Sequence, residues 1–548
     1  MRPDSILEYM NVSKGLLFGN EAHEKILKGV EAVAKLVGST LGPKGRCVIV
    51  ERIATNLQTK EVIRMGPMTT KDGVSVARAI ALPDPVENLG CDLIREAASR
   101  TVAEAGDGTT ASVVLAHKLI KDGFELVKNG LSPVWLRAGI DKAVTKVLEL
   151  LTQMSLPCNE ERESQIANIA ANGDPEIGQV VTEAIKKAGP NGIVSVDNAR
   201  SGKTHIEYSD GMRFDSGLRY QGFITDFSRN ECILENPFLL LHERRIQSIP
   251  QIEKLLQAVA STGRPLLIIS EEFELPIISF LLTNLTILKS CVVVAPFYGE
   301  RRRDFLRDLA VFTGGTAITE ELGIDLKMAG IDILGQAEKI IVTKAHTTII
   351  GGQSKGNELE ERVMSLQNAL KITTNGYEKE IFAERLAKLD GGVAVIKIGA
   401  YTDTEAKEKR DRTEDACLSV KCAQEAGIIP GGGIALLRCS ENIELLNYIL
   451  EFNKEEQAGA KLILNAMEAP LRQILKNGGY LEDEIMLSLQ RKENPNIGFD
   501  ALTGQVVDML NSGIIDPTKV IKQALMNAAS LAGTLLTTSG TIVHLEQK

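Results

Sequence analysis

The segment Ala105–Thr110, with the sequence AGDGTT, places two glycines, an aspartate and two threonines directly before an apolar stretch at 112–120. Glycines let the backbone approach a phosphate closely, and the start of a helix offers free N–H groups and a partial positive charge. Asp107 would repel a bare phosphate but suits a bridging Mg²⁺, which prefers carboxylate and phosphate oxygens. Short glycine motifs also match by chance, so a Gly/Asp turn with threonine capping explains this segment alone equally well.

Three further turns share this chemistry: Thr40–Gly45 (TLGPKG) closes a helical pattern, Thr69–Gly73 (TTKDG) is polar, and Gly431–Gly433 opens a helical pattern. The sequence contains no G-x-x-x-x-G-K-[ST] motif, so it is not a P-loop ATPase. A nucleotide site in this chain must therefore be assembled from separate turns.

Composition narrows the class of protein. The 548 residues are 44% hydrophobic and 24% charged, which predicts three or four domains with substantial cores at roughly 100–200 residues per domain. The net charge of -10 argues against a general nucleic-acid binder, and no charge-free run reaches the roughly 20 apolar residues of a membrane span.

The eight cysteines form no C-x-x-C pair and the six histidines are scattered, so we expect dispersed thiols and no structural zinc site. The first residues resemble neither a secretory signal nor a transit peptide, which favours a cytoplasmic location.

These turns must be positioned by secondary structure. Apolar spacing predicts a helix over 20–40, a strand over 47–50 and helices through most of 84–151. In the middle of the chain, the apolar runs Leu266–Ser270 and Cys291–Ala295 are typical of buried parallel strands, and Ser248–Gln251 is typical of a capped helix start. Charged helices are expected over 357–372, 376–389 and 404–426, with a strand over 391–400, before a second helical region. Helical ends flanking an α/β insert predict a nested architecture.

Seven segments, in order, resemble the group I chaperonins: TLGPKGR, TKDGVSVAR, AGDGTT, GGVAVIKIGA, PGGGIALL, AMEAPLRQI and DPTKV. The middle segments DGMRFDSG, GRPLLIISE and GERRRDFLRDLAVFTGGT resemble them too, so the similarity runs from about Phe18 to His544. The resemblance implies a multidomain α+β chaperonin fold. Its parts would be a mostly helical equatorial domain (1–153 and 426–548), a small intermediate hinge domain (154–209 and 393–425) and an α/β apical domain (210–392).

The resemblance also implies ATP, Mg²⁺ and K⁺ as cofactors. Asp107 matches the Mg²⁺-binding aspartate, and K⁺ would lie near the backbone of Thr40 and Lys71. The implied nucleotide contacts are Thr40, Leu41, Gly42 and Pro43 in the first turn, Lys71, Gly108, Thr109, Thr110 and Ala111 near the phosphates, Gly432 and Asp516 near the ribose, and Asp500 and Ala501 near the adenine.

Asp415, in the segment RTEDA, matches the family's hydrolytic aspartate, and Asp72 matches a second aspartate beside the attacking water. Taken alone, Asp415 is one carboxylate in a charge-rich helix, where a solvated face is the commoner explanation. Phosphoryl transfer depends mostly on positioning and charge neutralisation, so carboxylates, Mg²⁺ and backbone donors suffice.

The α/β insert resembles the domain that holds unfolded client proteins and a small co-chaperonin lid. Its hydrophobic rim would correspond to Leu218, Phe223, Leu256, Ile278, Leu281 and Leu282. Ordinary core packing is the competing interpretation, but the apolar excess around Ile277–Leu282 favours an exposed binding patch. The resemblance further implies homo-oligomeric, heptameric rings.

The chain also departs from the family pattern. It ends at His544–Lys548 without Gly-Gly-Met repeats, and Glu51–Arg64 is longer than the usual hairpin. Ala111 stands where threonine is usual and Asp500 where asparagine is usual. Tyr480 and Leu481 replace the usual acidic pair at the expected ring–ring contact, so the sequence does not decide between single and double rings. The expected rim is changed at Leu218, Gly222 and Glu253, so the identity of the lid and of the clients also stays open.

We therefore expect an ATP-dependent chaperonin subunit that binds unfolded proteins and promotes their folding. The alternative is a divergent chaperonin that acts mainly as an ATP-modulated holdase, because Ala111, Asp500 and the altered rim could weaken productive cycling. A third possibility, an unrelated metabolic ATPase, is supported by no substrate-pocket motif.

Overall fold

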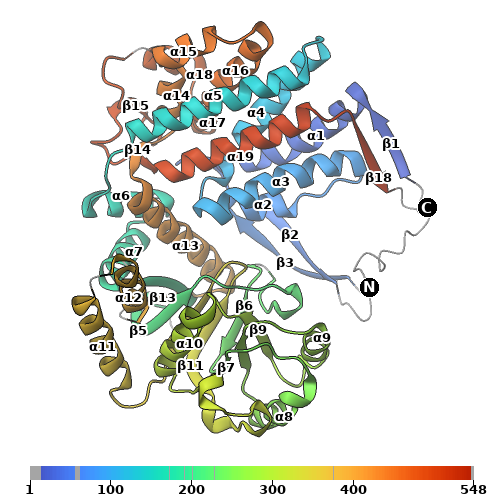
Figure 1. Cartoon of the computed structure of the whole chain (residues 1–548). Helices are drawn as coiled ribbons and strands as arrows, with labels where there is room; N and C mark the ends of the chain where they lie inside the picture. Colours follow the sequence, from blue (N-terminus) through green and yellow to red (C-terminus); the bar gives the residue numbers. More distant parts are fainter. Residues whose placement is uncertain are drawn as a thin grey trace. The chain divides into compact units, whose positions relative to one another are not determined.

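The computed structural model describes residues 14–544, except for 56–61, 172, 190–191, 200–201, 228, 374, 390 and 491. These residues form two compact units (Figure 1). Unit 1 comprises the described residues within Met1–Thr182, Asn198–Lys203 and Ile398–Lys548, and unit 2 those within Glu183–Asp197 and Thr204–Lys397. The two helical ends of the chain thus belong to one unit, into which the mixed middle is inserted.

Unit 1 is built around long helices: α1 (Gly19–Gly38), α3 (Pro85–Ala105), α4 (Thr109–Lys128), α5 (Pro133–Met154), α16 (Lys454–Met467) and α19 (Thr518–Leu536). Helix α1 packs on α3 and α4, α19 packs on α3, α4 and α5, and α16 packs on α5 (Figure 1). Their apolar faces share one core, to which Ile26, Leu115, Ile140, Ile463 and Leu525 contribute fully buried side chains. The helix predicted over 20–40 is confirmed as α1.

Close approach of these helices depends on paired glycines. A Cβ atom at Gly29 of α1 would lie 1.8 Å from the carbonyl oxygen of Glu87 in α3, and one at Gly90 would lie 2.2 Å from that of Ile26. Both helices therefore need glycine where they cross, because any side chain would force the backbones apart. Helices α5 and α16 meet in the same way, through Gly139 and Gly459.

The long helix α13 and several shorter elements complete unit 1. The helices are α2 (Gly73–Ala79), α6 (Glu160–Ala170), α13 (Asp403–Ala426), α14 (Ile434–Ser440), α15 (Ile443–Leu450), α17 (Ala469–Gly478) and α18 (Glu482–Leu489), and α7 (Pro175–Ala188) crosses into unit 2. Antiparallel pairs join β1 (Lys14–Phe18) to β18 (Gly540–His544), β2 (Val48–Thr55) to β3 (Val62–Thr70), β14 (Ile428–Pro430) to β17 (Ile515–Pro517), and β15 (Ile497–Asp500) to β16 (Gln505–Asp508). Of the predicted insertion Glu51–Arg64, residues 56–61 lie outside the described residues, as do residues 545–548 of the C-terminal segment.

Unit 2 is organised on a mixed sheet. Its strands are β4 (Ile193–Asn198), β5 (His205–Phe214), β6 (Cys232–Glu235), β7 (Phe238–His242), β8 (Leu266–Ser270), β9 (Ser290–Val294), β10 (Ala317–Ile318), β11 (Gly335–Val342), β12 (Thr347–Gly352) and β13 (Gly392–Ile398). The order is β4-β13-β5-β12-β11-β7-β8-β9, with β10 on β7 and β6 on β11. Strands β7, β8 and β9 are parallel and almost wholly buried, which confirms the parallel strands predicted from the apolar runs.

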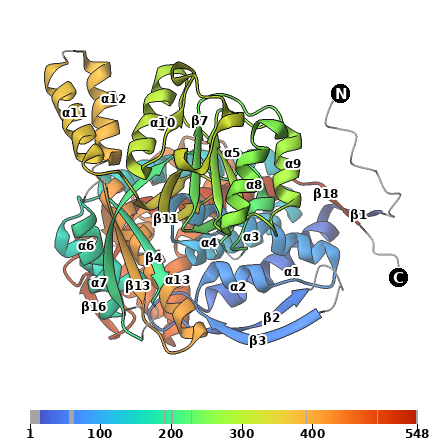
Figure 2. The same cartoon turned by 90° about the horizontal axis from the view of Figure 1, so that it is seen from below.

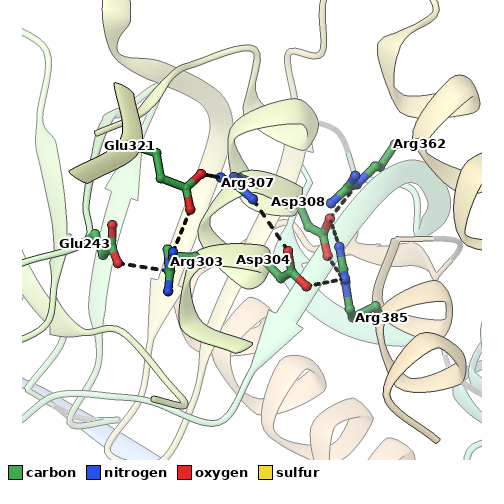
Figure 3. Close-up of polar contacts among 8 residues, drawn as sticks. All are labelled: Glu243, Arg303, Asp304, Arg307, Asp308, Glu321, Arg362 and Arg385. Atoms are coloured by element: carbon green, nitrogen blue, oxygen red, sulfur yellow. Dashed lines mark hydrogen bonds and ion pairs between the residues drawn. The ribbon is translucent and has the colours of Figure 1, made fainter. Parts of the chain in front are cut away.

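Helices α8 (Glu253–Thr262), α9 (Leu275–Thr283), α10 (Gly299–Thr313), α11 (Glu358–Ile372) and α12 (Gly376–Leu389) pack in unit 2, with single turns at Gln221–Phe223, Ile249–Gln251, Glu320–Leu322, Leu326–Met328 and Ile331–Ile333. The predicted helix start before α8 is confirmed, because Ser248 and Gln251 form a reciprocal capping box. Helices α11 and α12 lie side by side as a hairpin (Figure 2). Ion pairs around Asp308 tie α10 to both of them (Figure 3).

None of the helices in the described part of the chain combines the length and apolar character needed to span a membrane. All eight cysteines are free thiols. Five of them, Cys91, Cys232, Cys291, Cys422 and Cys439, are buried, and Cys47 is exposed.

Candidate functional site

Three of the polar turns singled out in the sequence meet in unit 1. The ammonium of Lys71 donates to the carbonyl oxygen of Gly42 at 3.3 Å, which joins the turn before α2 to the turn after α1. The hydroxyl oxygens of Thr40 and Thr110 lie 3.5 Å apart. A Cβ atom at Gly73 would lie 2.7 Å from the Thr110 hydroxyl oxygen, so the starts of α2 and α4 are also in contact. The structure therefore brings together the segments 40–43, 71–73 and 107–111.

Helix α4 presents its N-terminus at this meeting point. Gly108 precedes the helix in the left-handed conformation, with φ of 86°, and no side chain caps the first turn. The leading N–H groups, beginning with those of Thr109 and Thr110, carry the positive end of the helix dipole. Such an end binds phosphate or carboxylate groups. Ala111 packs its methyl group on the core of unit 1, so its replacement of threonine removes a hydroxyl without leaving a gap.

Asp107 stands between two donors. One carboxylate oxygen accepts from the N–H of Gly108 at 2.5 Å, and the other accepts from the hydroxyl of Ser419 in α13 at 3.1 Å. Burial raises the pKa of Asp107, the two hydrogen bonds oppose that rise, and the charge of Asp72 adds to it. The carboxylate therefore sits where a cation would be favoured.

Helix α13 carries Asp415 to the same place. Burial raises the pKa of Asp415 well above its usual value, and the charges of Asp107, Asp72 and Asp411 raise it further. The helix is fastened next to Asp107 by the thiol of Cys422, which donates to the carbonyl oxygen of Ala105 at 3.2 Å. Leu418 packs so closely on Gly106 that a Cβ atom there would lie 2.3 Å from that of Leu418.

Asp72 has a structural task as well. Its carboxylate accepts from the N–H groups of Val74 at 3.1 Å and Ser75 at 2.8 Å, and so caps α2. Asp72 still contributes its charge to Asp107 and Asp415. A role beside a reacting water would have to coexist with this capping.

Asp516 and Gly432 meet at the short sheet of β14 and β17. The carboxylate of Asp516 accepts from the N–H of Gly432, which adopts a positive φ of 64°. Burial and the charge of Asp107 raise the pKa of Asp516 to about 7. The structure thus brings the predicted ribose-binding residues together and places them within electrostatic reach of Asp107.

Asp500 and Ala501 lie in the turn between β15 and β16. The two carboxylate oxygens of Asp500 accept from the N–H of Leu502 at 2.8 Å and from the hydroxyl of Thr503 at 2.6 Å. The Asp500 side chain is therefore committed to its own turn. The carbonyl oxygen of Ala501 accepts from the hydroxyl of Tyr480 at 3.1 Å.

The residues present fit Mg²⁺ held together with a nucleotide. Burial raises the pKa values of Asp107, Asp415 and Asp516, and the charge of Asp107 adds to the rise at both of the others, so a cation would be favoured among them. The described residues contain no group of three or more His, Cys, Asp or Glu side chains arranged as a metal site. A cation here would therefore rely on one or two carboxylates plus phosphate oxygens, the usual arrangement for Mg²⁺.

Comparisons with known proteins identify the family of the chain. Residues 33–545 match the TCP-1/cpn60 chaperonin family. The chain belongs to this family. Two crystal structures of the chaperonin gp146 from the bacteriophage EL 2 (Pseudomonas aeruginosa) in the presence of ATP-BeFx are similar, each with 21% sequence identity over 97% of this chain and 99% of that chain. The TM-scores are 0.66 for crystal form II and 0.60 for crystal form I, so the chaperonin has the multidomain α+β fold of these structures.

Four of the six side chains of the predicted apolar rim are buried in unit 2. Phe223, Leu256, Ile278 and Leu281 are at most 5% exposed and belong to the core around the sheet, and Leu218 and Leu282 are only partly buried against that core. The prediction of an exposed rim is therefore wrong for the first four side chains. The physical reason is that these side chains share one core with the buried parallel strands: Leu256 comes from α8, Ile278 and Leu281 come from α9, and Phe223 comes from the turn Gln221–Phe223, which contacts β9. Leu275 and Ile287 are instead exposed, at 69% and 70%.

The sequence analysis did not connect Ser419, Tyr480 or Asn477 with the candidate site of the chaperonin. Ser419 follows Asp415 by four positions and so lies on the same helix face, a spacing that could have identified it. Tyr480 was singled out only for the expected ring–ring contact, and neither it nor Asn477 gave a signal for this site, because Lys44 and Gly38 are far away from them in the chain.

Proposed function

We propose that this chaperonin is an ATP-hydrolysing subunit that forms homo-oligomeric rings, binds unfolded proteins and promotes their folding. The observation that carries the proposal is the position of Asp415, which α13 holds within electrostatic reach of Asp107 and Asp72 beside the free N-terminus of α4. The gp146 structures, determined in the presence of ATP-BeFx, support nucleotide binding by this fold.

In the proposed mechanism, the N–H groups of Thr109 and Thr110 bind phosphate oxygens at the start of α4, next to Gly108, whose own N–H donates to Asp107. Asp107 would hold Mg²⁺, which would neutralise charge on the phosphates, and the backbone of Thr40 and Lys71 would hold K⁺. Gly432 and Asp516 hold the ribose, and the turn of Asp500 and Ala501 holds the adenine. Asp415 accepts a hydrogen bond from the attacking water and orients it, with Asp72 adding charge nearby.

We further propose that the equatorial, intermediate and apical domains have the bounds expected from the sequence, in heptameric rings in the cytoplasm with a small lid protein. Clients would bind unit 2. Because α13 carries Asp415 and lies in the intermediate segment 393–425, movement of this segment would couple hydrolysis to client release. Such coupling requires that ATP bind the alternative states with different affinity.

The decisive experiment is steady-state ATP turnover by Asp415→Ala. We expect turnover to fall by at least about 100-fold, the usual effect of losing a residue that assists proton transfer, while ATP binding persists. Glu414→Ala is the matched control, since Glu414 directly precedes Asp415 in α13 and pairs with Arg410 within the helix. Near-wild-type hydrolysis by Asp415→Ala would refute the role of Asp415.

A second candidate function is a holdase, which binds client proteins without refolding them and whose affinity for clients is modulated by ATP. The commitment of the Asp500 side chain to its own turn favours it, because Asp500 then contributes no contact of its own to the nucleotide. Refolding of denatured rhodanese with and without ATP separates the two functions. Recovery of activity only with ATP supports the folding chaperonin, whereas ATP-independent suppression of aggregation without recovery supports the holdase.

A further inference from the structure

The C-terminal end of α17 contacts the first nucleotide turn. The side-chain amide of Asn477 donates to the carbonyl oxygens of Gly38 at 2.8 Å and Leu41 at 2.9 Å. The helix ends at Gly478, and Gly479 follows with a φ of 76°, which reverses the chain and lays the Tyr480 ring against Gly478. Asn477 thus fixes this end of α17 against the turn that follows α1.

Tyr480 bridges that turn to the turn of β15 and β16. The ammonium of Lys44 donates to the Tyr480 hydroxyl at 2.7 Å, and the hydroxyl donates onward to the carbonyl oxygen of Ala501 at 3.1 Å. The ring packs edge to face on Phe499, with centroids 4.8 Å apart and planes at 81°. A Cβ atom at Gly504 would lie 3.1 Å from the hydroxyl oxygen, so the tyrosine also touches the far side of the turn.

We propose that Tyr480 is a positioning residue for the nucleotide, which sets the spacing between the Thr40–Gly45 turn and the Phe499–Gly504 turn. The proposal rests on the proposed function, in which these two turns contact the two ends of the same ATP molecule. Lys44 and Tyr480 are 436 residues apart in the chain, so no local structure fixes this spacing. A hydroxyl that accepts from one turn and donates to the other supplies that link, and the half-buried ring keeps it in place.

Tyr480→Phe removes the hydroxyl and keeps the ring on Phe499. Because the link would hold the nucleotide equally well before and during hydrolysis, its loss should raise KM and leave kcat unchanged. We expect Kd and KM for ATP to rise about 2- to 12-fold, the range for one lost hydrogen bond, with kcat within about twofold of wild type. The control is Tyr448→Phe, because Tyr448 packs on Phe452 with the same edge-to-face geometry, 4.8 Å and 79°, in α15.

A double-mutant cycle with Lys44→Met tests the bridge itself. If Lys44 acts through Tyr480, the increase in Kd for ATP in the double variant should be smaller than the product of the increases in the two single variants. Additive effects, or an unchanged KM in Tyr480→Phe with the thermal unfolding midpoint preserved, would overturn the proposal. A fall in kcat at constant KM would overturn it too.

These outcomes are distinguishable from failure of the proposed function. Absence of ATP binding in the wild-type chaperonin would overturn both proposals. A different pattern would overturn only the role of Tyr480. In that pattern the wild type hydrolyses ATP, Asp415→Ala abolishes hydrolysis, and Tyr480→Phe has the same KM for ATP as the wild type. Both single variants are measured as assembled full-length protein, with sizing to show that the assembly matches that of the wild type.

Discussion

The hydroxyl oxygen of Ser419 lies 3.1 Å from a carboxylate oxygen of Asp107, 312 residues away in the chain. This hydrogen bond connects the middle of α13 to the loop that precedes α4. Because Asp415 lies one helical turn before Ser419, the contact that fastens the helix also fixes where Asp415 stands. The predicted Mg²⁺ ligand and the predicted hydrolytic residue are therefore mechanically linked.

Ser419→Ala should loosen this link. Ser419 is 1% exposed, so its loss leaves an oxygen of Asp107 without its donor and weakens the docking of α13. We expect amides in the second half of α13 to exchange with solvent about fivefold faster, which corresponds to about 1 kcal/mol for one hydrogen bond. Hydrogen exchange measured by mass spectrometry checks this, with Ser440→Ala as control, since Ser440 bonds only within its own helix, to Leu437. Equal protection in both variants would show that the contact does not hold the helix.

Stability of the nucleotide-free chaperonin should fall as pH rises. The pKa of Asp516 is raised to about 7 by burial and by Asp107, and that of Asp415 is raised well above its usual value. In the unfolded chain these aspartates have the ordinary pKa of 3.8 and lose their protons above that pH. In the folded state they keep their protons up to a higher pH. Stability is highest at low pH within this window and declines from about pH 4 through about pH 7.

Asp516→Asn tests this pH dependence, because the amide oxygen can still accept from Gly432 but carries no charge. We expect the variant to raise the thermal unfolding midpoint at pH 8 and to change it little at pH 5, in EDTA without nucleotide. Asp141→Asn is the control, because Asp141 has an exposed side chain that pairs with Arg137 in α5. An equal shift at both pH values would contradict the titration of Asp516.

Local signals in the sequence were enough for most of the elements. Leu266–Ser270 was predicted as a buried strand and is β8, and the capping pattern at Ser248–Gln251 forms as expected. The helices predicted over 357–372 and 376–389 end at the same residues as α11 and α12. Apolar periodicity, caps and glycines act within a few residues, so one sequence reveals them.

Tertiary contacts were harder to predict from the sequence than these local elements. Leu256 and Leu281 have apolar neighbours on several sides, and only the sheet beneath them decides that they face inward. Asp72 was predicted as a site residue from its motif, but its capping of α2 depends on where that helix begins. The spacing from Asp415 could have pointed to Ser419, but the pairing of Ser419 with Asp107 and of Tyr480 with Lys44 joins residues hundreds of positions apart, which no local pattern encodes.

Asp500→Asn should leave nucleotide selectivity unchanged, even though asparagine is usual at this position in the family. Both carboxylate oxygens already accept from Leu502 and Thr503, so the side chain stabilises the turn and does not read the base. We expect KM for ATP to change by less than about fivefold, equivalent to about 1 kcal/mol, and the ratio of KM values for ATP and GTP to stay constant. Steady-state turnover with both nucleotides checks this, and Thr503→Val serves as a matched loss of the same turn contact. A tenfold change in the ratio would show that Asp500 contacts the base.

Asp308 should be the most sensitive charge in unit 2. It is 3% exposed and accepts from the Nε atom of Arg362 at 2.8 Å and from the Nε and Nη2 atoms of Arg385 at 2.7 and 2.9 Å (Figure 3). Burial alone would lower the pKa of Arg385, but the hydrogen bond and charge of Asp308 together raise it. One carboxylate of α10 thus pairs with guanidinium groups of both α11 and α12, and Asp304 of α10 adds a second negative charge beside Arg385.

Asp308→Ala removes that carboxylate and leaves Arg385 largely buried, paired only with Asp304. We expect a loss of about 3–5 kcal/mol in local stability, the usual result of breaking a buried pair from one side. Protease cleavage and hydrogen exchange within 358–389 should therefore rise far more than elsewhere in unit 2. The control is Glu321→Ala, because Glu321 is half-exposed and pairs with Arg303 and Arg307 in the same network (Figure 3), so its loss should cost less than about 1 kcal/mol. Equal protection of the α11–α12 hairpin in the two variants would mean that apolar packing, through residues such as Leu366 and Leu389, holds the hairpin without help from Asp308.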